Sequence, residues 1–392
     1  MIVFDSADMR FNNRVAGVCM HDGHVLLHRA ELDDFWALPG GRPGFLEPSR
    51  DALLREMQEE LEVTVEVGRL PPPLVPPTPH HSITQRRLLC SQAERRHDHE
   101  KGARVTEGML VGVQTPTQRP WPELAEQWAW LERIGFDSLW LADHYVPPFK
   151  LDGPIFEPWT LLAGLALATE RVRLGVLVSC NTFRHPPLVA KEAVTIDHIS
   201  GGRLEFGLGA GWFVPEHEMF GIPFPSNAEL VGRFREAVEI CHLLFTQDIT
   251  TYEGTYYQVR DAPFRPAPVQ QPRIPFTLAA HGPRMMRIVA RYADRWNSNG
   301  SVAEMAERNR LLDEACAEVG RDPGQILRSH LYVPAIHTNE HPWESPEALR
   351  DFTGRLYESG IREAIIQIPP DIAPRQVERI AEAAAELRAV PA

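Results

Sequence analysis

The sequence contains few cysteines and no cysteine motif. Its five cysteines are scattered over 392 residues without a Cys-x-x-Cys pair; they are Cys19, Cys90, Cys180, Cys241 and Cys316. An odd number of widely spaced cysteines excludes a disulfide framework and a zinc knuckle. The first ten residues, MIVFDSADMR, include Asp5 and no apolar run of signal-peptide length. We therefore expect a protein of the reducing cytoplasm.

The sequence also has no long apolar run, and basic residues are fewer than acidic ones. The longest apolar stretch, Leu161 to Ala168, is far shorter than the ~20 residues that span a bilayer. The 40 lysines and arginines face 53 aspartates and glutamates, and the net charge of −13 repels nucleic-acid phosphates and anionic lipid. We expect neither a membrane nor a nucleic acid as partner. A small-molecule substrate is the expected partner, and a homo-oligomer is left open.

Proline, by contrast, is abundant and clustered. The 35 prolines are about 9% of the chain against a usual ~5%. Six of them fall within PPPLVPPTP, residues 71–79, and the residues that follow up to 108 show neither helical nor strand periodicity. Such a stretch is typical of an extended linker. It divides the chain into an N-terminal segment 1–70, a linker 71–108 and a C-terminal domain 109–392.

The N-terminal segment predicts a small α+β arrangement. Residues 14–30 alternate like two strands with a turn at Asp22-Gly23, and residues 46–61 repeat apolar side chains at helical spacing. Three carboxylates at positions i, i+3 and i+4 share one face of that helix: Glu56, Glu59 and Glu60. They suit a hard divalent cation such as Mg²⁺, which could bridge a diphosphate. A solvated acidic helix face is the alternative.

The same helix belongs to a longer motif. With Gly41 and Glu47 upstream, it matches the spacing G-x5-E-x7-R-E-U-x-E-E-x-G-U except at Glu62, where the pattern has glycine. The segment resembles the Nudix hydrolases, and the resemblance implies that the three carboxylates bind metal. The later strands and closing helix of that fold are replaced by the proline run, and half a fold buries too little surface to be stable alone. We interpret 1–70 as a truncated Nudix-like segment and predict no diphosphate hydrolysis.

The C-terminal domain alternates strand and helix patterns. Strands are expected at 109–115, 137–143, 173–180, 204–209, 275–280, 295–299, 327–336 and 363–369. Helices are expected at 122–135, 158–169, 186–200, 232–245, 283–293, 303–319, 346–359 and 373–389, with irregular stretches before 232 and before 275. Eight strand–helix pairs in about 280 residues predict an α/β protein with a (β/α)8 TIM barrel.

A barrel of this type carries its chemistry at the C-terminal ends of its strands. Asp143 and His144 fall at such an end, and an imidazole there could hold or move a proton near neutral pH. A histidine hydrogen-bonded within a loop is the alternative. We interpret Asp143 as a partner of backbone amides. Cys180 ends the next strand without a base visible in the sequence, which favours a small buried thiol.

Four local signatures occur in order along the C-terminal domain. They are WLADHY (140–145), GVLVSCNTFRHPPLVAKEAVTIDHISGGRLEFGLGAGW (175–212), EHEMFGIPF (216–224) and ARYADRWN (290–297). Together they resemble the luciferase-like monooxygenase superfamily, most closely its oxidoreductases that use the deazaflavin coenzyme F-420. The resemblance implies a barrel of the bacterial-luciferase type. It also implies that His144 faces the deazaflavin ring and is the catalytic residue.

The resemblance further implies which residues contact the coenzyme. The family often has a non-proline cis peptide at the end of the third strand, here 179–182, where the backbone presses against the ring. A plain turn at the strand end is the alternative. The coenzyme-contacting residues that it implies around this strand and the next are Asp143, Ser179, Cys180, Asn181, Ala210, Gly211 and Trp212.

Two glycine-containing loops bear on the coenzyme side chain. The glycines at 207, 209 and 211 do not follow G-x-G-x-x-G, and the segment WFVPEHEMFG after them is not expected to open a helix, so a dinucleotide-binding Rossmann motif is excluded. The loop 280–285 joins a strand to a helix N-terminus, which favours a phosphate, although Pro283 removes one amide donor. Its assigned residues are Ala280, His281, Gly282, Arg284 and Met285.

The expected function is hydride transfer between F-420 and a small organic substrate that the sequence does not identify. In such an enzyme the protein positions the coenzyme, and the coenzyme performs the redox chemistry. Three alternatives remain open at this stage. The same barrel could use FMN and oxygen as a monooxygenase, it could bind a flavin or deazaflavin without turnover, or the N-terminal segment could hydrolyse diphosphates with Mg²⁺.

Overall fold

The computed structural model describes residues 108–149 and 151–388 in full, and four short strands before them by their backbone. The chain divides into two compact units, Met1–Glu100 and Lys101–Ala392. In the first unit β1 (Val3–Ser6) pairs with β2 (Met9–Asn12), and β3 (Met20–His21) pairs with β4 (His24–Val25), all antiparallel.

One prediction for the first unit is tested and two are not. His21 lies opposite His24 in the pair β3–β4, as the hairpin predicted around Asp22-Gly23 requires. The predicted helix with Glu56, Glu59 and Glu60 lies outside the described residues. The predicted linker 71–108 does so too, except for its last residue. The Nudix-like segment and its Mg²⁺ site therefore stay predictions.

Eight parallel strands of the second unit close into a barrel. In circular order they are β5 (Leu110–Gln114), β6 (Ser138–Leu141), β7 (Arg173–Val176), β9 (Leu204–Gly209), β12 (Phe276–Ala279), β13 (Arg295–Ser298), β14 (Leu327–Tyr332) and β15 (Glu363–Gln367). The ring closes where β15 pairs with β5, with Glu363 opposite Leu110. The (β/α)8 barrel predicted from the strand–helix alternation is confirmed.

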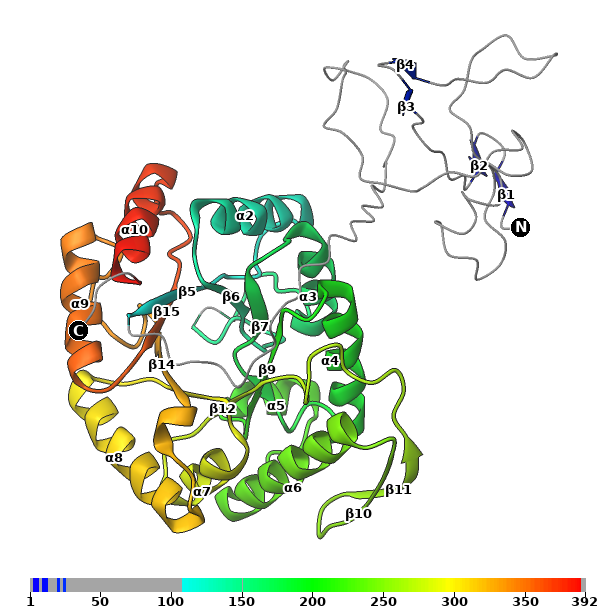
Figure 1. The fold of residues 1–392 in the computed structure, drawn as a ribbon, viewed down its shortest axis with the longest axis vertical. Helices are drawn as coiled ribbons and strands as arrows, with labels where there is room; N and C mark the ends of the chain where they lie inside the picture. The colour runs from blue at the N-terminus through cyan, green and yellow to red at the C-terminus, as the bar shows by residue number, and fades with distance from the viewer. Residues whose placement is uncertain are drawn as a thin grey trace. The chain divides into compact units, whose positions relative to one another are not determined.

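Eight helices surround the strands (Figure 1). They are α2 (Trp121–Ile134), α3 (Pro158–Ala168), α4 (Pro186–Ser200), α6 (Asn227–Thr246), α7 (Pro283–Tyr292), α8 (Val302–Val319), α9 (Pro346–Glu358) and α10 (Pro374–Leu387). A 3-10 turn, Pro323–Gln325, follows α8. None of these helices has the length and apolarity needed to cross a membrane, in the part of the chain that the structure describes.

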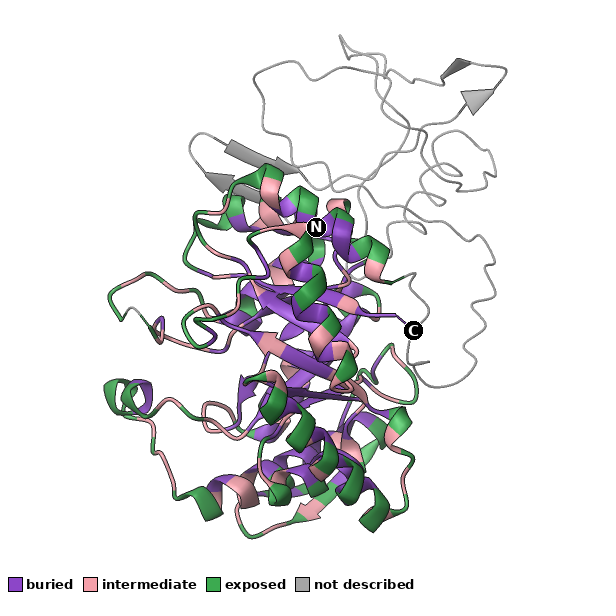
Figure 2. Ribbon diagram, turned by 90° about the vertical axis from the view of Figure 1, so that its left-hand side faces the viewer, coloured by how far each residue is buried: buried purple, intermediate pink, exposed green. Residues whose placement is uncertain are grey.

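The sequence pattern of the strands follows from burial on both sides. Every residue of β6, β9 and β13 is buried, because helices cover the outer face and the barrel interior fills the inner one. The helices instead bury one stripe and expose the other, as Figure 2 shows by the change from purple to green. Some strands with this covering are mainly apolar, as β6 (SLWL) is, and such strands are predictable from sequence. β13 (RWNS) instead buries polar side chains.

A buried ion cluster stabilises the opposite end of the barrel from the strand C-termini. Arg295, at the start of β13, lies 2.8 Å from the Glu205 carboxylate and 2.9 Å from that of Glu363. Ser138 donates to Glu363 at 3.0 Å. Each of these residues is the first or second residue of its strand, at the end of the barrel opposite the cavity. We therefore infer that the cluster stabilises the fold and takes no part in catalysis.

The third strand differs from the prediction. The expected strand 173–180 is interrupted after Val176, and β8 (Ser179–Cys180) pairs with β9 on its own. The non-proline cis peptide is present, but it joins Leu177 to Val178 and does not fall within 179–182. Gly207 makes room for this path, because a Cβ there would lie 1.9 Å from the Val176 carbonyl oxygen.

Three further expectations need correction. The segment WFVPEHEMFG does contain a helix, α5 (Val214–Phe220), although its seven residues do not belong to a Rossmann unit. The stretch before 275, expected to be irregular, contains the antiparallel hairpin β10 (Ile249–Glu253) and β11 (Gln258–Pro263). Helix α6 begins at Asn227, five residues before the predicted start, because the Ser226 hydroxyl caps the Glu229 amide.

Candidate active site

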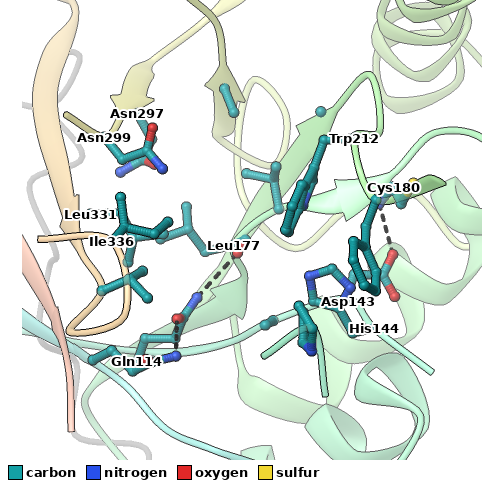
Figure 3. A pocket seen from close by; sticks show the side chains of 18 of the residues that line it. Gln114, Asp143, His144, Leu177, Cys180, Trp212, Asn297, Asn299, Leu331 and Ile336 are labelled. Carbon is teal, nitrogen blue, oxygen red and sulfur yellow. Dashed lines mark hydrogen bonds between the residues drawn. The ribbon is translucent and has the colours of Figure 1, made fainter. Parts of the chain in front are cut away.

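A cavity of about 780 Å³ opens at the C-terminal end of the barrel. Each barrel strand contributes a lining residue within one position of its end: Gln114, Ala142, Leu177, Gly209, Ala279, Ser298, Leu331 and Gln367. This volume lies within the range of roughly 300–1,000 Å³ in which ligand pockets fall. Figure 3 shows His144, Trp212 and Cys180 on one side of the cavity, Leu331 and Ile336 on the other, and Leu177 between them.

His144 is held by a buried glutamate. Its Nδ1 lies 2.9 Å from Oε2 of Glu216, on helix α5, and the two rings that flank it edge-on are those of Trp212 and Phe213. The carboxylate must accept this bond, so in the neutral ring Nδ1 carries the hydrogen and Nε2 is the basic atom. Nδ1 is thereby occupied, and Nε2 is the atom that remains for a bound molecule.

The Glu216 carboxylate also binds the backbone after β6. Its other oxygen accepts from the amides of Tyr145 and Val146, the latter at 3.0 Å. Burial would raise the pKa of Glu216, but the hydrogen bonds from His144 and from these amides outweigh burial and hold the pKa below its ordinary value. Glu216 is thus a buried carboxylate that orients the imidazole and the loop beside it.

Asp143 has the structural role that the sequence indicated. Its carboxylate accepts from the Cys180 amide at 2.7 Å and forms a two-pronged pair with Arg184, at 2.7 and 3.1 Å. Burial raises the pKa of Asp143, and the Arg184 charge opposes the rise. Arg184 itself also pairs with Glu157 at 2.5 Å. Asp143 therefore ties the ends of two neighbouring strands together beside His144.

Cys180 is a buried thiol, as predicted, with a polar neighbourhood. Its Sγ lies 2.9 Å from Oγ1 of Thr182 and 4.0 Å from Nε2 of His217. Burial raises its pKa to about 12, so it is not a nucleophile near neutral pH. Nε2 of His217 lies 2.6 Å from the Thr182 hydroxyl, and its Nδ1 lies 2.9 Å from the Phe213 carbonyl oxygen.

Carboxamide side chains form a polar part of the wall. Gln114 donates to the Leu177 carbonyl at 3.2 Å and accepts from Gln367 at 3.2 Å, which links β5 to β15 across the seam of the barrel. Asn297 donates to the Ser329 hydroxyl at 2.8 Å and keeps its carbonyl oxygen for other donors. The sequence analysis did not single out these residues, because carboxamides at strand ends carry no spacing signal.

The loop before α7 reaches the cavity through Ala280, His281 and Gly282, and the first turn of α7 reaches it through Met285. Burial, followed by the nearby Arg308 charge, lowers the pKa of His281. No side chain caps the first amides of α7, and a Cβ on Gly282 would meet no atom within 4 Å. The loop thus presents open backbone to the cavity.

Most of the residues implied by the family resemblance meet at this cavity. Its lining includes Asp143, His144, Ser179, Cys180, Ala210, Gly211, Trp212, Ala280, His281, Gly282 and Met285. Two residues of the set do not line it. Asn181 turns its amide to the Tyr257 hydroxyl at 3.4 Å, and Arg284 lies on the first turn of α7 outside the lining.

Glu216 is the main functional residue that the sequence analysis missed. It lies within the signature EHEMFGIPF, yet nothing in the sequence pairs it with a histidine 72 residues earlier. No group of three or more His, Cys, Asp or Glu side chains suited to a metal occurs among the described residues.

Nearly all of the second unit matches a known family. The family model described as "Luciferase-like monooxygenase" aligns with residues 106–389, which include the barrel and its cavity. The chain belongs to the luciferase-like monooxygenase family. The four signatures in the sequence had indicated this family, and the match confirms it.

Curated proteins similar to this luciferase-like chain include oxidoreductases. An F-420-dependent glucose-6-phosphate dehydrogenase of Microbacterium testaceum is 35% identical over 197 residues, 48% of this chain and 57% of that protein. Phthiodiolone/phenolphthiodiolone dimycocerosates ketoreductase of Mycobacterium bovis is 30% identical over 254 residues, 58% of this chain and 64% of that protein. The matches span about half to two thirds of the length of these relatives.

Solved structures show the same luciferase-like barrel. An F-420-dependent secondary alcohol dehydrogenase in complex with an F-420–acetone adduct superposes with a TM-score of 0.63. The alignment covers 70% of this chain and 98% of that one at 19% identity. At this identity the likeness establishes the fold.

Proposed function

We propose that this protein is an oxidoreductase that transfers a hydride between coenzyme F-420 and a small organic molecule. The observation that carries the proposal is His144, which Glu216 holds at 2.9 Å in a cavity at the strand ends of a luciferase-like barrel. Several curated relatives of 30% identity or more, such as the Microbacterium testaceum enzyme, are F-420-dependent dehydrogenases. An imidazole in this position can hold or release a proton during hydride transfer.

The lining of the cavity fits a deazaflavin. A tricyclic ring needs apolar faces, which Leu177 and Val178 offer, and its pyrimidine edge needs donors and acceptors, which Gln114 and Asn297 offer. The uncapped amides of α7 beside Gly282 suit the coenzyme phosphate. When bound, F-420 would supply the carbon that accepts or gives the hydride.

Each of the site residues would then have its own role. His144 would hold the substrate proton on Nε2, since Glu216 occupies Nδ1. Asp143 would act indirectly, because its ion pair with Arg184 fixes the strand end on which Ser179 and Cys180 stand. Asn181 and Arg284 would support the coenzyme site from outside its lining.

A parallel titration with F-420 and with FMN tests the proposal. We expect tight binding of F-420, seen as a change in its absorbance, and weaker binding of FMN. Preferential binding of FMN with oxygen consumption would replace the proposal by a monooxygenase of the same barrel. Binding of either coenzyme without turnover of any alcohol, ketone or aldehyde would make the protein a carrier.

Three expectations from the sequence remain predictions beside this proposal. They are the cytoplasmic location, the homo-oligomer that the composition leaves open, and a truncated Nudix-like segment that does not hydrolyse diphosphates, with a possible Mg²⁺ site at Glu56, Glu59 and Glu60.

A further inference from the structure

The mouth of the cavity carries an unusual set of apolar side chains. Phe149, Trp212 and Ile336 come from three separate loops, which follow β6, β9 and β14, and all three line the same cavity. Each nevertheless exposes about half of its surface, 57%, 58% and 47% respectively. Apolar side chains that converge on one opening and stay exposed mark a site for an apolar partner.

The apolar surface continues from the mouth into the cavity. Leu177 and Leu331 face the space between His144 and the far wall, and Figure 3 shows Ile336 beside Leu331 at that wall. Pro147 and Pro148 extend the lining on the side of the β6 loop. Hydrocarbon side chains therefore line part of the cavity between the mouth and His144.

The charged side chains Asp143, Arg184 and Glu216 beside the cavity already bind other groups of the protein. Asp143 and Arg184 pair with each other, and Glu216 is saturated by His144 and two backbone amides. Among the described residues of the lining there is neither a lysine nor an arginine. The proposed function gives the open amides of α7 beside Gly282 to the coenzyme phosphate. An anionic substrate at the mouth would therefore lose its hydration without a compensating cation from the described lining residues, whereas an uncharged substrate has no such desolvation cost.

We infer that the substrate is an uncharged, largely apolar alcohol or ketone, and not a phosphorylated sugar. The inference rests on the proposed function and narrows it. In the oxidative direction the carbinol C–H bond would break, and bound F-420 would supply the two-electron acceptor for its hydride. The hydroxyl proton would pass to Nε2 of His144 as the C=O bond forms. In the reductive direction every step runs in reverse.

The test uses the full chain with oxidised F-420 and a series of secondary alcohols from propan-2-ol to octan-2-ol. If the chain of the alcohol lies along the apolar wall, kcat/KM should rise by about fourfold for each added methylene until the wall is filled. Glucose 6-phosphate, the substrate class named for the Microbacterium relative, should be turned over at least 100-fold less efficiently than octan-2-ol.

A matched pair of variants locates the effect. Ile336→Asp places a charge at the apolar mouth, and Ile249→Asp places the same charge on the exposed hairpin strand β10, away from the lining. We expect Ile336→Asp to lower kcat/KM for octan-2-ol at least tenfold and to flatten the chain-length series. The loss of kcat/KM should be smaller for propan-2-ol than for octan-2-ol. Ile249→Asp should match the wild type throughout.

Binding without coenzyme provides an independent readout. Saturation-transfer NMR with octan-2-one should show contact with the coenzyme-free wild type and with Ile249→Asp, and a loss of at least tenfold in affinity with Ile336→Asp. If F-420 binds but efficiency does not rise with chain length, or if glucose 6-phosphate is preferred, the substrate class is wrong and the proposed function stands. If F-420 does not bind, the proposed function fails. The ketone measurement then decides the apolar site alone, with Ile336-dependent binding supporting it and its absence overturning it.

Discussion

Glu216 and His144 form a buried pair across two loops of the barrel, with 2.9 Å between Oε2 and Nδ1 although 72 residues separate them in sequence. The same carboxylate accepts the amides of Tyr145 and Val146. Helix α5 therefore fixes the ring of His144, its tautomer in the neutral state and the loop that follows it. The proton transfer that we propose for His144 depends on this arrangement.

Replacing His144 by alanine should lower turnover by roughly 100-fold or more, because the imidazole would no longer take or give the proton in the transition state. The Kd of F-420 should change much less. The matched control is His198→Ala, since His198 is exposed on α4 and its ring contacts the Ala267 carbonyl oxygen, outside the lining of the cavity. Steady-state kinetics check the prediction, and an unchanged kcat for His144→Ala would reduce the residue to a structural role.

Glu216→Gln should lower kcat by about tenfold while the Kd of F-420 stays within threefold. Glu216 fixes the orientation of the His144 ring through its hydrogen bond, and glutamine would hold the ring less well. Glu216→Asp, which keeps a carboxylate, should retain more of kcat than Glu216→Gln. A role in packing alone would favour the isosteric glutamine instead. Glu218→Gln, an exposed change on the same helix, is the control.

The ionised Glu216 should also contribute to acid stability. Its pKa lies below the ordinary value of 4.5, so the unfolded state takes up protons first as the pH falls. The stabilisation is complete well above pH 4.5 and is lost as the pH falls through the lower folded pKa. The difference in unfolding free energy between wild type and Glu216→Gln should therefore shrink on acidification, and denaturant titrations at several pH values measure it.

Arg184→Met should destabilise the fold by about 3–5 kcal/mol at pH 7, because it leaves the Asp143 carboxylate buried without its cation. Burial already raises the pKa of Asp143, and losing Arg184 should raise it further. A raised carboxyl pKa favours the folded state at low pH, so the deficit should be smaller at pH 5 than at pH 7. Arg310→Met, on an exposed helix face, should show no such pH-dependent deficit.

Cys180 should resist alkylation in the native protein. Its pKa of about 12, against an ordinary 9.0, lowers the thiolate fraction at neutral pH by on the order of 1,000-fold. Iodoacetamide labelling followed by mass spectrometry should therefore modify Cys180 only after denaturation. Rapid native labelling would show that the thiol is ionised and would reopen a nucleophilic role.

Residues 109–392 should fold and bind F-420 without the first 108 residues, because the barrel closes on itself through β5 and β15. The truncated protein should retain the Kd of the full chain within tenfold and unfold cooperatively. An insoluble product, or a larger loss of affinity, would contradict the division of the chain into an N-terminal segment, a linker and a barrel.

The fold was predictable because each of its elements is local. A strand covered on both faces often has a run of apolar residues, as β6 (SLWL) does, and a surface helix repeats its apolar residues at helical spacing. Helix α4 has the predicted bounds, 186–200. The hairpin β10–β11 was missed because its strands are largely exposed and carry no alternating pattern. The seven residues of α5 were too few to show a period.

The sequence by itself determined the barrel, the family and the position of His144, because strand ends and family signatures are patterns of consecutive residues. Only the tertiary structure decided that Glu216 orients His144, that Gln367 bonds Gln114 from 253 positions away, and that Ile336 and Phe149 share one opening. Such contacts depend on how eight strands twist and close into a ring. Closure sets the distances between strand ends that the sequence places far apart.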